Sequence, residues 1–189
     1  MNDAPELSHS FSPMTGRQRL LTTLQFQQPD RPPHFEEMFE LTAEAFGREF
    51  PSERAIAAAT GEARDRLLHE CVEVYALIVE RFRWDGLCLW RPWGGPPLLE
   101  CLRIAVRELG RDILIGAYIE GSIHAIDTVT DYEAFSADLY ERPEEMHAQA
   151  RAMSDGAIAR GRAIREAGAD FVNLVSDVAF NGGPFISPA

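Results

Sequence analysis

The sequence is short of positive charge, and this limits the partners that it can attract. Its 18 Lys and Arg residues stand against 30 Asp and Glu residues, which gives a formal net charge of −12 at pH 7. Nucleic-acid binders need a basic surface, so this composition argues against a general role of that kind. It also provides no long-range attraction for a highly anionic substrate.

Cysteine is scarce as well. Cys71, Cys88 and Cys101 form no Cys-x-x-Cys pair, and none stands beside a histidine at the spacing of a zinc site. All three lie in apolar patterns that are typical of buried, reduced thiols. The chain therefore predicts no metal site and shows no cofactor motif of its own.

Several other signals are missing. No apolar run is long enough to cross a bilayer, and the N-terminus lacks the basic region and apolar stretch of a signal peptide. No Gly-x-Gly-x-x-Gly and no P-loop follows any expected strand, which argues against nucleotide binding. We therefore expect a cytoplasmic protein with no membrane and no nucleic-acid partner.

What the sequence does contain is an alternation of helical patterns with short, almost wholly apolar runs. Ser12-Pro13 predicts the start of a first helix after a disordered tail at 1–12. Further helices are expected at 37–50, 61–82, 98–109, around 132–140 and at 143–164, and strands at 32–39, 84–90, 112–121 and 170–177.

Strands that are apolar on both faces belong to parallel sheets covered by helices, so the fold class is α/β. The pattern fits a (β/α) barrel or a doubly wound sheet. About four βα units are present, whereas a complete TIM barrel has eight. The chain is therefore expected to form the N-terminal part, residues 13–189, of one TIM barrel domain, truncated about half-way.

Four segments, in order, resemble the uroporphyrinogen decarboxylase (URO-D) superfamily, which includes the cobalamin-dependent methyltransferases. They are MTGRQRLLTTLQFQQPDRPP, DILIGAYIEGS, DYEAFSADLYERPEEMHAQ and AGADFVNLVSDVAFNGGPFISPA. The resemblance runs from Met14 to Ala189. It implies a single TIM barrel of about twice this length, in which this chain ends just after the fourth strand.

The resemblance also bears on the branch of the superfamily. Decarboxylases grip substrate carboxylates with an arginine-containing MRQAGR stretch after the first strand, but this chain has HFEEMFELTAEAF there, with Glu36, Glu37 and Glu40. They also carry an Asp after the second strand, where this chain has Trp90-Arg91-Pro92. Two parts of decarboxylase chemistry are thus missing, and the methyltransferase-like branch is favoured.

The implied activity is methyl transfer between a corrinoid protein and a small acceptor. The full-length methyltransferase-like enzyme would use zinc and a corrinoid partner, with zinc ligands beyond Ala189. The alternatives are uroporphyrinogen decarboxylation, which needs no cofactor, and an inactive fragment or interaction piece. The open edges of a half-barrel also predict association, including a homodimer.

Candidate site residues follow from the barrel, because its active site is built at the strand ends and the loops after them. As catalytic residues we predict Asp177 and Glu120, with Asp177 accepting a proton or a substrate N–H. As substrate-binding residues we predict Glu36, Glu37, Trp90, Arg91, Ser122, His124 and Asn181. Simpler roles remain open: Asp177 as a loop cap, Trp90 as a packing residue, Arg91 as the partner of a surface acid and His124 as a surface group.

Overall fold

The centre of the molecule is a three-stranded parallel sheet. The computed structural model describes residues 13–126 and 128–186, so the tail predicted at 1–12 lies outside it. The strands are β1 (Gly86–Leu89), β2 (Leu114–Ile119) and β3 (Phe171–Leu174), in the order β1-β2-β3. Cys88 pairs with Gly116, and Tyr118 pairs with Asn173. The α/β class with a parallel sheet is confirmed, whereas the described strands do not close a barrel.

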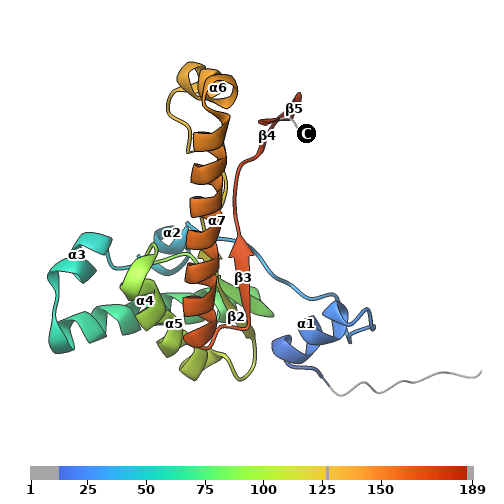
Figure 1. The fold of residues 1–189 in the computed structure, drawn as a ribbon. Helices are drawn as coiled ribbons and strands as arrows, with labels where there is room; N and C mark the ends of the chain where they lie inside the picture. The colour runs from blue at the N-terminus through green and yellow to red at the C-terminus, as the bar shows by residue number, and fades with distance from the viewer. Residues whose placement is uncertain (1–12, 127, 187–189) are drawn as a thin grey trace, which may run out of the picture.

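Helices α4 (Gly61–Phe82), α5 (Gly95–Leu109) and α7 (Pro143–Glu166) cover one face of this sheet (Figure 1). Alternate strand residues on that face, among them Leu87, Leu89 and Ile115, are fully buried. The predicted bounds of α4 are confirmed, because its apolar stripe recurs at helical spacing along its whole length. These helices and strands share one hydrophobic core.

Helix α1 (Gly16–Leu24) begins later than the sequence predicted. Thr15, not Ser12, is the N-cap: its side chain accepts a hydrogen bond from the backbone N–H of Gln18, whose side chain in turn accepts from Thr15 N–H. This capping box satisfies donors that a helix start otherwise leaves unpaired. Ser12 lies outside the described residues.

Charged residues of the N-terminal segment pack against the amino ends of the strands. Arg19 is buried and pairs with Asp30 and with Asp85, the residue just before β1. Arg31 also donates to Asp85, at 2.8 Å, and Arg17 pairs with Asp170, the residue just before β3. The MTGRQRL segment is therefore architectural, at the end of the sheet that serves stability in TIM barrels.

Two predictions between α1 and α4 are wrong. Residues 32–41 form no strand in the structure. Instead of a ladder, they have one backbone–backbone bond, from Asp85 N–H to the His34 carbonyl, and bonds from side chains of the sheet to Glu37. The helix expected over 37–50 is reduced to α2 (Thr42–Phe46), which ends at Gly47 with φ 65°, and α3 (Glu53–Ala58) follows Pro51. Proline at 32, 33 and 51 removes backbone donors that a ladder or a longer helix needs.

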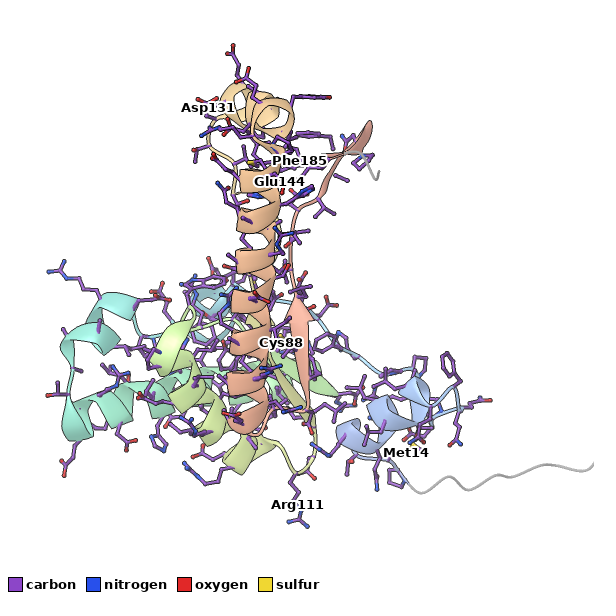
Figure 2. The ribbon with its side chains drawn as sticks, viewed as in Figure 1. Met14, Cys88, Arg111, Asp131, Glu144 and Phe185 are labelled. Atoms are coloured by element: carbon purple, nitrogen blue, oxygen red, sulfur yellow. The ribbon has the colours of Figure 1, made fainter. Side chains whose placement is uncertain are left out.

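The remaining elements form an arm beyond the sheet. Helix α6 (Tyr132–Glu141) and the hairpin β4 (Ala179–Phe180) and β5 (Gly183–Pro184) lie at the far end of α7 (Figure 1). Phe185 stacks on Phe135 with ring centroids 5.3 Å apart, which ties the hairpin to α6. Figure 2 shows Phe185 and Glu144 together in this arm, well away from Cys88 in the sheet.

None of the helices in the described ranges is both long enough and apolar enough to span a membrane.

Candidate functional site

The carboxyl ends of the three parallel strands lie along one edge of the sheet, followed by Trp90, Glu120 and Val175. We call this the strand-end edge. In a barrel built from parallel strands, this is where reacting groups gather.

One tyrosine hydroxyl bonds the backbone at the start of the loop after β1. The hydroxyl of Tyr75, a fully buried residue of α4, accepts from Trp90 N–H at 3.0 Å and from Arg91 N–H at 2.6 Å. It donates to the Arg91 carbonyl at 2.9 Å. The tyrosine thus fixes the backbone of two predicted site residues.

The side chains of Trp90 and Arg91 differ in how far they are free to contact a ligand. Trp90 is buried against Tyr75 and Phe50, and its indole N–H finds no acceptor among the described residues. The Arg91 guanidinium lies 3.4 Å from the Glu40 carboxylate and over the ring of Trp93, 5.2 Å from its centroid. Arg91 therefore already has an acid and an aromatic partner.

Glu37 is joined to the sheet by polar groups on the face opposite the helices. The Tyr118 hydroxyl donates to the Glu37 carbonyl at 3.2 Å, and the Asn173 amide lies 3.4 Å from the Glu37 carboxylate. Burial raises the pKa of Tyr118, and the negative charge of Glu37 adds to the effect. Burial, and then the same charge, raises the pKa of the Cys88 thiol, which keeps it protonated. Glu36, by contrast, is exposed beside His34, 3.5 Å away.

The loop after β2 carries buried polar atoms without partners. Ser122 is buried, and neither its hydroxyl nor Nε2 of His124 makes a hydrogen bond within the described part of the chain. The His124 ring packs on Phe135 at 5.2 Å between centroids. Ile126 N–H donates to the Asp177 carbonyl at 2.8 Å, so this loop and the one after β3 are joined.

Asp177 and Asn181 are both exposed, but their places differ. The Asp177 carboxylate accepts no hydrogen bond from the described residues, so its role as a loop cap gains no support. Asn181 lies in the turn between β4 and β5, in the arm beside α6 and away from the strand-end edge (Figure 1). The structure thus links Asp177 with the Ser122–His124 loop and leaves Asn181 apart.

A cavity of about 380 Å³ lies beside the strand-end edge, between α5 and α7. Apolar side chains such as Leu89, Leu98 and Ile164 make up most of its wall. Trp90, Trp93, Glu120 and Arg160 also line it, as do Gly94 and Gly95 at the start of α5. Two of the predicted site residues, Trp90 and Glu120, thus border a single cavity.

Part of the chain matches a known protein family. Residues 92–185 match the family of uroporphyrinogen decarboxylase (URO-D). The match runs from the loop after β1 to the hairpin and confirms the family resemblance seen in the sequence.

The fold of this chain is similar to that of a methyltransferase from Methanosarcina mazei. The TM-score is 0.62 at 16% sequence identity, and the alignment covers 84% of this chain and 58% of that chain. The likeness shows a shared fold. This chain spans less than two thirds of the methyltransferase's length. No curated protein matches the sequence.

The URO-D resemblance did not point to Tyr118, Asn173 or Arg160, which the structure adds to the strand-end edge. A polar Asn inside the apolar run DFVNLV was the one available signal, since such a residue needs a buried partner. Arg160 lies on the predicted long helix and donates to the Glu120 carbonyl at 2.6 Å. Its position depends on how α7 packs, which helical periodicity alone does not specify.

A zinc site does not fit the described residues. Within 13–126 and 128–186, no three His, Cys, Asp or Glu side chains gather as metal ligands do. All three cysteines are buried and unpaired by disulfides. No chemical step is therefore assigned to zinc in this part of the molecule.

Proposed function

We propose that this chain is part of a methyltransferase-like enzyme of the URO-D family that moves a methyl group between a corrinoid protein and a small acceptor. The observation that supports this proposal is the charge at the strand-end edge. Glu37 and Glu40 lie there with Glu120. Of the two arginines at this edge, Arg91 is already paired with Glu40, and Arg160 donates to the Glu120 carbonyl.

This charge pattern favours a small acceptor over a porphyrinogen. A substrate with several carboxylates would meet more acids than arginines at this edge, and like charges at close range are costly. A thiol, amine or hydroxyl acceptor must lose a proton when it is methylated. A nearby carboxylate can act as the base that accepts this proton. Glu120 and Asp177 are the candidates for that base, and Trp93 offers an apolar wall in the cavity that Glu120 lines.

Uroporphyrinogen decarboxylation is the second candidate, because residues 92–185 match the family that carries that name. It would require arginines to hold the substrate carboxylates and an acid after β1 to face the pyrrole nitrogens. The loop after β1 instead begins Trp90-Arg91-Pro92, with Trp90 buried. This candidate is therefore ranked below methyl transfer.

One assay separates the candidates. The complete protein that contains this chain is incubated with methylcobalamin and a panel of thiol and amine acceptors, and the methylated acceptor is measured by mass spectrometry. Formation of product above the rate without protein supports the proposal, with Glu120→Gln or Asp177→Asn slowing it. A parallel incubation with uroporphyrinogen that yields coproporphyrinogen above the non-enzymatic rate would reverse the ranking. If neither product forms, the chain is an inactive piece.

A further inference from the structure

The cavity between α5 and α7 combines a mostly apolar wall with an arginine, Arg160. Its volume of about 380 Å³ is in the range of sites for small organic ligands. Leu98 from α5, Ala163 and Ile164 from α7, and Leu89 from β1 enclose it on the helix side of the sheet. An aliphatic chain would replace water against these side chains, which is favourable.

The N-terminus of α5 contributes positive charge at one end. This helix of 15 residues has no acidic residue in its first turn and no side chain that caps it. One carboxylate lies close by, because Glu53 accepts a hydrogen bond from Trp93 N–H at 2.7 Å, just before the N-cap Gly94. Gly94 and Gly95 have φ of 59° and 63°, and a Cβ built on Gly94 would meet nothing within 4 Å. The helix start is open to the cavity, without side chains in the way.

Arg160 adds a full charge at the same cavity. Its guanidinium donates to the Glu120 carbonyl, and it forms no ion pair with a carboxylate among the residues that the structure describes. The remaining donors of an exposed guanidinium can take a carboxylate in a bidentate manner. Trp90 supplies a further observation, because it lines the cavity and is 1% exposed, and its indole N–H has no acceptor in the described residues.

The donors present favour a carboxylate over a phosphate. Pro96 and Pro97 occupy the first turn of α5 and have no N–H groups, so the helix start lacks the row of donors that binds phosphates. A single guanidinium matches one planar carboxylate. We infer that this cavity binds a small aliphatic carboxylate, with its carboxylate at Arg160 and the start of α5 and its chain against Leu98 and Ile164.

The inference is independent of methyl transfer, because binding is measured without a corrinoid or a methyl acceptor. The probes are octanoate and its neutral counterpart octanol, each titrated into the chain in an isothermal calorimeter. Four proteins are compared: the natural sequence, Arg160→Gln, Arg162→Gln and Ala163→Phe. Arg162 is an exposed arginine on α7 that does not line the cavity, so its variant is the matched control for charge.

We expect saturable octanoate binding that weakens about tenfold in Arg160→Gln, as for the loss of a charged hydrogen bond. Octanol should bind the natural chain and Arg160→Gln alike, and Arg162→Gln should behave as the natural sequence does. Ala163→Phe should lose both ligands, because its ring fills the cavity. Glu120→Gln should bind octanoate more tightly, because it removes a negative charge from the cavity wall.

Circular dichroism of each variant establishes that it is folded. Arg160 is exposed, so its replacement provides a test even where Ala163→Phe does not fold. Three results would overturn the inference: no octanoate binding to the natural chain, equal octanoate affinity in Arg160→Gln, or unchanged binding in a folded Ala163→Phe.

Discussion

Removing one hydroxyl, in Tyr75→Phe, should destabilise the chain out of proportion to its size. Tyr75 is fully buried, and its hydroxyl makes three hydrogen bonds to the backbone of Trp90 and Arg91. Phenylalanine keeps the ring contacts with Phe50 and Trp90, whose centroids lie 4.8 and 4.9 Å away. The change thus isolates the polar contribution from the packing of the ring.

The expected magnitude follows from the groups that lose their partner. The Trp90 N–H is buried, and a buried donor left unpaired costs about 1–3 kcal/mol. The N–H and carbonyl of Arg91 are partly buried and can be rehydrated in part, which adds about 1 kcal/mol. The free energy of unfolding should therefore fall by about 2–4 kcal/mol, or roughly 4–16 °C in Tm for a chain of this size.

Urea denaturation followed by circular dichroism measures this loss. The matched control is Tyr140→Phe, because Tyr140 is 87% exposed and makes no hydrogen bond through its hydroxyl within the described ranges. The control should stay within about 0.5 kcal/mol of the natural sequence. The reasoning is refuted if Tyr75→Phe is as stable as this control, since the three bonds would then contribute nothing net.

Three further predictions concern activity, pH and association. In the complete protein, Asp177→Asn should lower turnover about 10²-fold, as for a lost general base. The Tm should not change, because the carboxylate accepts no hydrogen bond in the described structure. Unchanged turnover would remove Asp177 from the site. The hydrogen bond from Arg19 holds the pKa of Asp30 well below its usual range, so the contribution of Asp30 to stability is present above about pH 4 and is lost as pH falls further. In Asp30→Asn the midpoint of urea denaturation should therefore fall less steeply with decreasing pH. An equally steep decline would contradict this. Leu174 and Val172 on the edge strand are 60% and 45% exposed, so the isolated chain should dimerise or aggregate; light scattering should show less association for Leu174→Lys, and a monodisperse monomer of the natural chain would disprove the idea.

The local sequence pattern was enough to predict the helices and strands whose apolar residues recur at regular spacing. Helix α4 has the predicted bounds because its apolar stripe repeats along 22 residues, and β1, β2 and β3 lie inside the predicted apolar runs. Parallel pairing also followed, since strands that are separated by helices and apolar on both faces have few other arrangements. The family resemblance rested on the same ordered segments and was confirmed over residues 92–185.

The tertiary structure decided everything that depends on residues far apart in the chain. Whether 32–39 forms a strand depends on a neighbour that offers a ladder, and the segment instead contacts the sheet through His34 and the chain around Glu37. Arg91 could have held a ligand or a surface acid, and only folding brings it to Glu40, 51 positions away. The cavity between α5 and α7 likewise comes from the packing of helices onto a sheet. Periodicity specifies which face of a helix is buried, whereas the partner across the gap is fixed by three-dimensional packing alone.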